Sequence, residues 1–411
     1  MPSRGLSTAV ALVTALVTVL VAARARGSGF ELVEQSPEAV ATAGAQTADA
    51  SAAAAVYYNP AALTFQPGTT LQGGANLFVY RGVATTASGD VESSGLYATP
   101  TVFGGVRVAP RYAVGIGVFD PFAWSIAYPD GWAGRMSGLS LELRALAVNP
   151  SVAFRPVPWL AIGFGVDIVP TTLSYRRATA LSGGPGNGDG LLAVDTSATG
   201  VGGNASILVR VVPRWLDVAV AYRSAIDLDL SSSAARATLP LPHQLSFAIA
   251  SRPVAGLTLT TDVRLTLWSD LRALSFTFSD MTTPKESVTL DYADSVGVRA
   301  GATYRFWRDA DAEPRVAVRI GGGWEQGPTA PAATSPLLPD GDRFVVGGGA
   351  GIRFGAVAVD AGYLAAIASE LTGANGTFVA RYHAVTHTVS VALTFRLPNF
   401  PSRLNEPEFK R

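Results

Sequence analysis

The chain has 411 residues, of which 48% are apolar, and its 31 Lys and Arg side chains equal its 31 Asp and Glu side chains in number. The net charge of zero gives no electrostatic reason to expect nucleic acid as a partner, and the absence of cysteine excludes disulfides and thiolate metal ligands. The mean hydropathy of +0.28 is high for a soluble protein.

Residues 1–25 are typical of a secretory signal peptide. Arg4 supplies a basic start, Ala9–Ala22 form an apolar stretch, and Ala23-Arg24-Ala25 has small residues spaced for cleavage. The alternative is a retained membrane anchor, but the apolar stretch is shorter than a spanning helix usually needs. No uncharged apolar run near 18 residues long follows residue 25. For an exported apolar chain, the remaining way to cross a membrane is a closed barrel.

Residues 26–67 differ from the rest of the chain because they are rich in alanine and poor in β-branched runs. Short helical turns are predicted over residues 39–55. Asn59-Pro60 ends them, since the residue before a proline is pushed out of the helical region and proline has no N–H. We expect this segment, including Asn59, Pro60 and Ala61, to be a plug or hatch inside a barrel. The alternative is a disordered alanine-rich linker.

Residues 68–396 carry the period of two that is typical of strands facing lipid on one side and a lumen on the other. From Leu160 to Ile168, every second residue is large and apolar, and the residues between them are small or acidic. A soluble sandwich also alternates, but its second face would be rich in Lys, Glu and Thr. We therefore predict an all-β fold, a transmembrane antiparallel barrel of about fourteen strands. The predicted strands lie near residues 69–83, 97–108, 112–120, 140–154, 159–173, 195–212, 215–229, 243–251, 256–279, 290–306, 314–325, 343–354, 356–368 and 381–396.

The connections between these segments alternate in length. Short ones lie near residues 109–111, 155–158, 213–214, 252–255, 309–313 and 355, and longer ones lie between them. Bacterial outer-membrane barrels have short periplasmic turns, long outer loops and an even strand count. The alternation therefore favours an even number of strands with both ends on the periplasmic side.

Several motifs together resemble one known family, the FadL type of outer-membrane transporters for long-chain fatty acids and other hydrophobic compounds. The motifs are Gly29-Phe30-Glu31-Leu32, Asp49-Ala50-Ser51 leading to Asn59-Pro60-Ala61, Pro121-Phe122, Trp132-Ala133-Gly134-Arg135, Asn149-Pro150-Ser151 and Leu338-Pro339-Asp340-Gly341. The resemblance covers nearly the whole chain after residue 25. Each motif is weak alone, and their order and spacing carry the identification.

This resemblance implies a plugged barrel of fourteen strands in the outer membrane of a Gram-negative bacterium, with passive uptake and lateral release into the membrane. It implies that Phe30 reaches the ligand pocket. The expected partners are a hydrophobic small molecule, a fatty acid or a hydrocarbon, and the outer-membrane lipid; no cofactor, no metal and no nucleic acid is expected, and the protein is expected to be a monomer. Residues 397–411 are expected to form a periplasmic tail, a departure from barrels that end at an aromatic residue.

The long loop over residues 121–139 is the predicted outer binding surface. Its candidate ligand-binding residues are Phe122, Trp124, Tyr128, Trp132 and the cation Arg135. A large exposed apolar patch usually marks a binding surface. Arg135 can bind a carboxylate through two hydrogen bonds. The alternative is that the aromatic residues only fold the loop onto the barrel rim and that Arg135 pairs with loop acids.

The third predicted strand carries Gly115 and Gly117 shortly before Asp120-Pro121. Glycine permits bends in a strand and proline removes a ladder hydrogen bond. We hypothesise a lateral opening at these glycines, which continuous hydrogen bonding to both neighbouring strands at this level would contradict.

An enzyme is not expected. His383 and His387 are four residues apart, which on a strand separates them by roughly 13 Å, too far for one metal ion. No G-x-S-x-G motif occurs. Two function classes remain, a transporter for hydrophobic molecules and a general porin or structural barrel. An aromatic-hydrocarbon transporter is an alternative within the first class.

Overall fold

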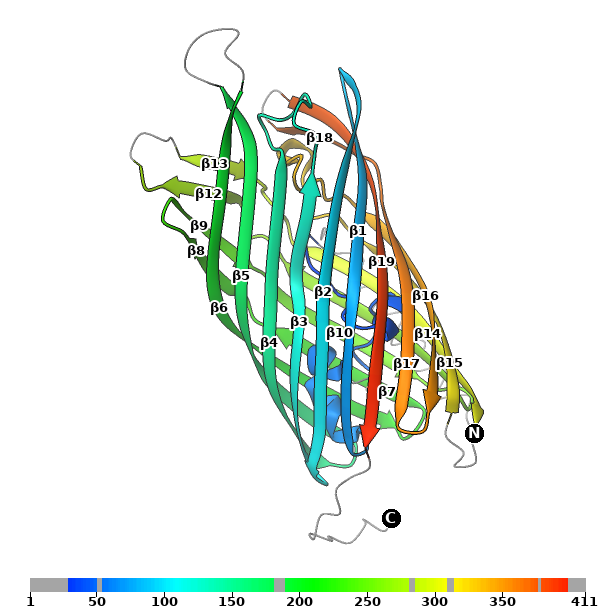
Figure 1. Cartoon of the computed structure of the whole chain (residues 1–411). Helices are drawn as coiled ribbons and strands as arrows, with labels where there is room; N and C mark the ends of the chain where they lie inside the picture. The colour runs from blue at the N-terminus through cyan, green and yellow to red at the C-terminus, as the bar shows by residue number, and fades with distance from the viewer. Residues whose placement is uncertain are drawn as a thin grey trace.

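The computed structural model describes residues 29–49, 54–180, 189–280, 285–308, 314–375 and 378–397 (Figure 1). The predicted signal peptide and the predicted tail beyond Leu397 lie outside the described residues.

The wall of the molecule is a single antiparallel sheet that closes on itself. It closes because β1 (Thr69–Thr86) pairs with both β2 (Gly89–Ala109) and β19 (Phe378–Leu397). The other wall strands are β3 (Tyr112–Ala127), β4 (Ser140–Val157), β5 (Leu160–Ala180), β6 (Asp189–Val212), β7 (Leu216–Arg223), β10 (His243–Ser251), β11 (Leu257–Leu267), β14 (Ser295–Arg308), β15 (Pro314–Glu325), β16 (Arg343–Phe354) and β17 (Val357–Ala368). This closed 14-strand barrel confirms the predicted fold class and strand count.

Five further strands lie at the end with the long connections: β8 (Ile226–Ser231), β9 (Ala235–Leu241), β12 (Ala273–Phe278), β13 (Glu286–Thr289) and β18 (Leu371–Asn375). β8, β9, β12 and β13 pair in that order and project beyond the wall (Figure 1). The predicted continuous strands at 215–229 and 256–279 were therefore wrong in one respect, since each breaks into a wall strand and an outer strand.

Exposed and buried side chains alternate along the wall strands, as the sequence predicts. On β5, Phe164 is 55% exposed on the outward face, whereas Asp167 is 1% exposed on the lumen face. The short connections, such as Pro110-Arg111 and Gly355-Ala356, lie at one end, and the long ones lie at the other. The tight turn at Ala87-Ser88 is an exception, because it joins β1 to β2 at the long-loop end.

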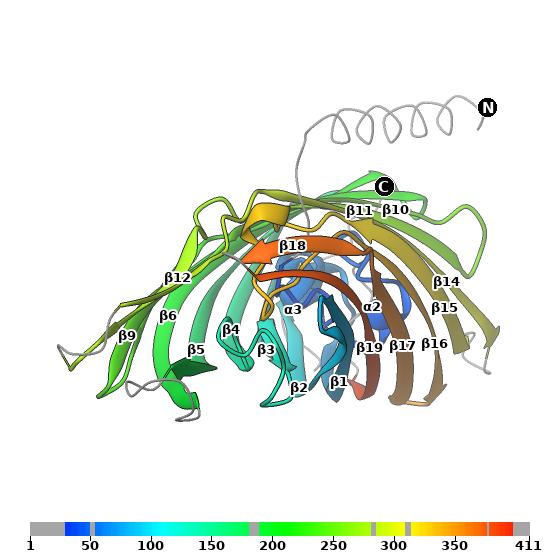
Figure 2. The same cartoon turned by 90° about the horizontal axis from the view of Figure 1, so that it is seen from above.

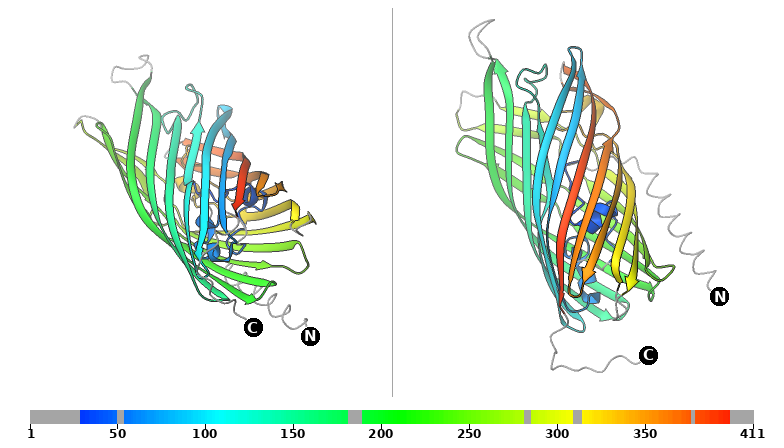
Figure 3. Two further views of the ribbon diagram at one scale, coloured as in Figure 1. Left: turned by 60° about the horizontal axis from the view of Figure 1, so that its bottom comes forward. Right: turned by 45° about the vertical axis from the view of Figure 1, so that its right-hand side comes forward.

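Residues 29–49 and 54–67, here called the lumenal segment, lie inside the barrel and are almost all buried (Figures 2 and 3). α2 (Pro37–Ala41) begins at Ser36, whose hydroxyl accepts the Ala39 N–H, and packs against β15, β16, β17 and β19. α3 (Ala55–Tyr58) and the 3₁₀ helix η1 (Pro60–Phe65) follow, and η1 contacts β2 to β6 on the other side of the lumen. The segment therefore touches opposite walls.

Glycines in the wall let the lumenal segment approach this closely. A Cβ at Gly347 on β16 would overlap the Val40 carbonyl oxygen, and one at Gly163 on β5 would overlap the backbone of Pro60-Ala61. Gly347 and Gly349 thus lie under α2, whereas Gly348 faces outward. The absence of side chains at Gly347 and Gly349 makes room for α2.

Candidate functional site

A small cavity of about 60 Å³ lies in the lumen between the start of the lumenal segment and the wall. We call it the lumenal cavity. Its lining is largely apolar and comes from Gly29, Phe30, Glu31, Leu32, Glu34, Phe78, Tyr80, Gly95, Tyr97, Ala123, Trp124, Ser125, Arg343, Val345, Leu364, Ala366, Thr386 and Thr388. An apolar cavity with few polar groups is the usual form of a small-molecule site.

The first described residues pair with β3 beside this cavity. The Leu32 N–H donates to the Pro121 carbonyl at 2.9 Å, and the Ala123 N–H donates to the Phe30 carbonyl at 3.1 Å. Glu31 and Phe122 thus form an antiparallel bridge. β4 occupies the other edge of β3 here, so residues 30–32 occupy the edge that faces β2.

β2 leaves that edge free because its ladder with β3 is interrupted between the pairs Ser94–Ala127 and Val102–Val118. The ladder between β3 and β4 also shifts register between Phe119 and Phe122, which places Asp120-Pro121 in a bulge. A bulge bends its strand and increases the local twist. The wall therefore has a stretch without direct strand pairing, and Gly95, Tyr97 and Trp124 from this stretch line the cavity.

The predicted opening at Gly115 and Gly117 is wrong in position. Both glycines lie in continuous ladders, to Gly105 and Phe103 on β2 and to β4 on the other side. Their small size serves packing instead: a Cβ at Gly115 would lie 2.8 Å from the side chains of Leu63 and Val56 in the lumenal segment. The interruption lies further along β3, after the bulge.

Phe30 lies at the centre of a buried aromatic group. Its ring is 4.8 Å from that of Trp268 and 6.0 Å from that of Phe122, and Trp268 lies 5.8 Å from Tyr292. Phe30 and Trp124 line the lumenal cavity, whereas Phe122 packs behind Phe30. The structure thus brings these three predicted residues together.

The other predicted loop residues lie away from the cavity. The rings of Tyr128 and Trp132 stack at 4.0 Å, and the Tyr128 hydroxyl donates to the Pro336 carbonyl at 3.0 Å. Arg135 forms an ion pair with Asp189. Both aromatic side chains are buried, so their placement supports the alternative that they fold the loop onto the rim.

Sequence reasoning missed Phe78, Tyr80, Tyr97 and Arg343. A signal for the first two was present, because the lumen-facing residues of β1 change from Gln72, Gly74 and Asn76 to aromatic side chains. A large aromatic residue on the lumen side of a barrel strand indicates either a packed plug or a ligand. Arg343 gave no such signal, since arginine is common on lumen faces of this chain.

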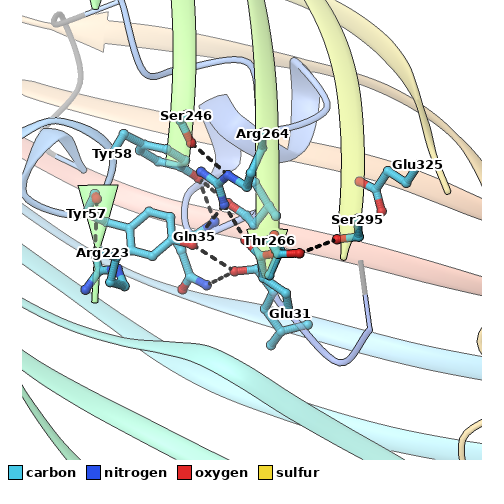
Figure 4. A network of polar contacts seen from close by, with 12 residues as sticks. Glu31, Gln35, Tyr57, Tyr58, Arg223, Ser246, Arg264, Thr266, Ser295 and Glu325 are labelled. Carbon is cyan, nitrogen blue, oxygen red and sulfur yellow. Dashed lines mark hydrogen bonds and ion pairs between the residues drawn. The ribbon is translucent and has the colours of Figure 1, made fainter. Parts of the chain in front are cut away.

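Polar contacts fix the start of the lumenal segment (Figure 4). The Glu31 carboxylate accepts hydrogen bonds from Arg264 on β11 at 2.5 Å and from Thr266 at 2.8 Å. The Gln35 amide donates to the carbonyl oxygens of Leu32 at 2.6 Å and Asp120 at 2.8 Å. Charge-assisted hydrogen bonds of this kind are stronger than neutral ones, so Glu31 is the strongest polar anchor of residues 30–32.

The hatch residues lie deeper in the lumen. Asn59 ends α3 in an extended conformation and donates from its amide to the Thr47 carbonyl at 2.9 Å. Pro60 opens η1, and the Ala61 N–H donates to the Ser206 hydroxyl on β6 at 3.0 Å. The motif thus connects two parts of the lumenal segment to the wall.

Within the described ranges, no three His, Asp or Glu side chains gather as a metal site. Among the same residues, no helix is long and apolar enough to cross a membrane.

These features define a membrane-spanning transport barrel whose lumen holds the N-terminal part of its own chain. A family model described as "Outer membrane protein transport protein (OMPP1/FadL/TodX)" matches residues 18–396, and the chain belongs to this family. Its members are passive outer-membrane transporters of hydrophobic compounds in Gram-negative bacteria, not enzymes.

The chain is similar to outer membrane protein P1 of Haemophilus influenzae, with 24% identity over 85% of this chain and 88% of that protein. Among solved structures, a Pseudomonas aeruginosa FadL homologue matches with a TM-score of 0.79 and 19% identity, over 90% of this chain and 100% of the other. The Ralstonia pickettii toluene transporter TbuX matches with a TM-score of 0.67 and 19% identity, over 91% of this chain and 99% of the other. At these identities the likeness establishes the fold.

Proposed function

We propose that the protein takes up hydrophobic molecules, long-chain fatty acids in particular, through the lumenal cavity and releases them sideways between β2 and β3. The observation that carries this proposal is the position of the cavity. It is bordered by Phe30 and Leu32 and by Tyr97 and Trp124, which belong to the interrupted stretch of the wall. A molecule in the cavity is thus separated from the membrane by side chains and residues 30–32, without a continuous strand ladder.

Residues 30–32 act as the gate in this proposal. They hold the free edge of β3 through two backbone hydrogen bonds, and Phe30 is 3% exposed. Each backbone hydrogen bond stabilises by about 1 kcal/mol and burial of a phenylalanine by about 2 kcal/mol. Contacts of this strength can break locally while the continuous ladders keep the barrel folded.

We favour a fatty acid because Arg343 supplies a cation among the aromatic and aliphatic residues of the lining, whose other charged groups are Glu31 and Glu34. Its guanidinium donates to Glu325 at 2.5 Å and also borders the cavity, where it can meet a carboxylate. Each buried CH₂ of the ligand contributes roughly 0.8 kcal/mol. The second candidate ligand is an aromatic hydrocarbon, which the rings of Phe78, Tyr80 and Trp124 favour.

The two ligand classes differ in their need for Arg343. The variant Arg343→Met keeps the length of the side chain and removes its charge. If the ligand is a fatty acid, uptake of oleate by cells should fall about tenfold to a hundredfold, since a charge-assisted hydrogen bond is worth about 1.5–3 kcal/mol, while toluene uptake should stay unchanged. An equal loss of both would favour a structural role for Arg343 and leave the fatty-acid proposal without support.

The gate is tested by locking it. Because the chain has no cysteine and Glu31 lies opposite Phe122, the double variant Glu31→Cys/Phe122→Cys can form a disulfide between the lumenal segment and β3. We expect uptake of a fluorescent fatty acid to stop when the pair is oxidised and to return with reductant. The single variants, treated identically, are the controls. If the oxidised double variant took up the fatty acid as fast as the same variant treated with reductant, residues 30–32 would not be the gate.

The porin alternative predicts a different readout. A wet, open lumen conducts ions, whereas a lumen filled by the lumenal segment should conduct poorly. Planar-bilayer conductance of the intact protein at porin level would favour a general porin.

A further inference from the structure

Two Tyr–His pairs on the outward face of the barrel have the same geometry. Tyr222 on β7 bonds Nδ1 of His243 on β10 at 2.8 Å, and Tyr363 on β17 bonds Nδ1 of His387 on β19 at 2.8 Å. The planes of the tyrosine and histidine rings are inclined by 21° in the first pair and by 25° in the second. In both pairs, the histidine lies two residues before the residue directly opposite the tyrosine, Leu245 in one case and Val389 in the other.

The two pairs differ in what else the imidazole binds. Nδ1 of His243 also accepts the Ala225 N–H at 3.0 Å, so this nitrogen is held as an acceptor and the ring is tied to the backbone. Among the described residues, Nδ1 of His387 has the Tyr363 hydroxyl as its one hydrogen-bond partner, and this hydroxyl can donate or accept. His387 therefore keeps this hydrogen bond in either protonation state and has Nε2 available as a donor.

One arginine, Arg81, lies diagonal to His387 on the outward face. β1, next to β19, places Arg81 opposite Val385, on the outward face and diagonal to both His387 and His383. Arg81 is exposed and makes no ion pair or hydrogen bond with any described residue. The remaining strand neighbours of His387 on this face are the uncharged Val79 and Ala365.

Arg81, His383 and His387 form an outward-facing patch, and two acids lie at its border. Glu92 on β2 is opposite Val83 and forms no ion pair with Arg81 among the described residues, and Glu370 pairs with Arg381 at 3.7 Å. Within the part of the chain that the structure describes, Arg81, His383 and His387 therefore form no ion pair, and Glu92 is the acid nearest to Arg81 along the strands.

The height of the patch matches the outer membrane interface. His387 lies ten residues above Leu397, which pairs with the first residue of β1 at the short-turn end. Ten residues at about 3.3 Å each, on a strand tilted by about 40°, rise by roughly 25 Å, the height of the apolar band of such barrels. An arginine on the lipid face is unfavourable at the membrane midplane and tolerated at the interface, where phosphate groups lie.

We propose that Arg81, His383 and His387 bind the phosphate of a membrane lipid at the outer interface. Arg81 supplies the bidentate charged contact, and Nε2 of His387 supplies a further donor whose direction Tyr363 fixes through Nδ1. The Tyr222–His243 pair has the same shape without the arginine and serves only to join β7 to β10. This inference is independent of the proposed transport function.

The three histidines make the test direct. The ¹⁵N-histidine-labelled protein in zwitterionic micelles is titrated with short-chain phosphatidic acid, with phosphatidylcholine of equal chain length, and with inorganic phosphate. We expect saturable shifts of the His387 and His383 signals with phosphatidic acid alone and no shift of His243. The variant Arg81→Gln should weaken the binding at least tenfold.

Three outcomes of the titration would overturn the proposal. These are equal shifts at His243 and His387, no shift at His387, and an equal response to inorganic phosphate, which would make the patch a site for the free ion. An unchanged affinity of Arg81→Gln would also contradict it. His243→Gln is the matched variant that should bind normally, and the heat-modified mobility of each variant in SDS confirms that its barrel is folded.

Discussion

The substitution Glu31→Gln removes the charge that anchors the gate and keeps the size of the side chain. The Arg264 side chain is 11% exposed and that of Glu31 is 1% exposed, so the pair is buried. Removal of one partner from a buried pair usually costs about 3–5 kcal/mol because the other charge is left unpaired. Arg264 keeps a 3.0 Å hydrogen bond to Ser246, which places the expected cost near the lower limit. A cost of about 3 kcal/mol corresponds to a roughly hundredfold larger open population.

Two amides report this opening directly. The Leu32 and Ala123 N–H groups form the hydrogen bonds between the gate and β3, so their hydrogen exchange in the folded barrel measures how often the gate opens. We expect exchange about a hundredfold faster at both amides in Glu31→Gln and unchanged exchange at Val114, which lies in the continuous ladder. The control Glu370→Gln breaks an exposed pair and should have no effect. Unchanged exchange at Leu32 and Ala123 would refute the anchor role of Glu31.

Three further predictions follow from packing and burial. Gly347→Val should displace α2 and lower the thermal stability, because overpacking costs about 1–3 kcal/mol, whereas Gly348→Val should not, since its Cβ would meet no atom closer than 3.8 Å. Burial raises the pKa of Asp340, in the loop after β15, from 3.8 to about 7. Between these values the folded loop binds more protons than the open one, so its resistance to proteolysis should fall from about pH 4 to about pH 7 and level off above, and Asp340→Asn should remove this dependence. Trp132→Ala should make residues 128–139 protease-sensitive without changing the mobility of the folded barrel, because loss of a buried tryptophan costs about 3–5 kcal/mol.

The strands were predictable because alternation is a local property of the sequence. One of the two strand breaks also left a signal. In β11 the apolar residues are odd-numbered and face outward, as Leu267 does, whereas Trp268, Leu274 and Phe276 beyond the break are even-numbered and buried. This change of phase indicates that the chain leaves the membrane near Trp268.

The break between β7 and β8 left no such signal. Tyr222 faces outward with 41% exposure, and Leu228 is fully buried, yet both are even-numbered and the apolar period continues between them. The chain reverses its inward face at Ser224-Ala225, a backbone event without a composition signal. For the same reason, the glycines of β3 were interpreted as a bend when they make room for Leu63 and Val56.

The interrupted wall and the lumenal segment depend on each other. In a membrane, a strand edge without partners exposes backbone groups to hydrocarbon at a cost of several kcal/mol each. Here the Pro121 carbonyl accepts from Leu32, the Ala123 N–H donates to Phe30, and the Asp120 carbonyl accepts from the Gln35 side chain. The segment thus satisfies from inside the groups that β2 leaves free. Deletion of residues 29–35 should therefore lower the stability of the barrel as well as raise its conductance, whereas a plug that only filled the lumen would affect conductance alone.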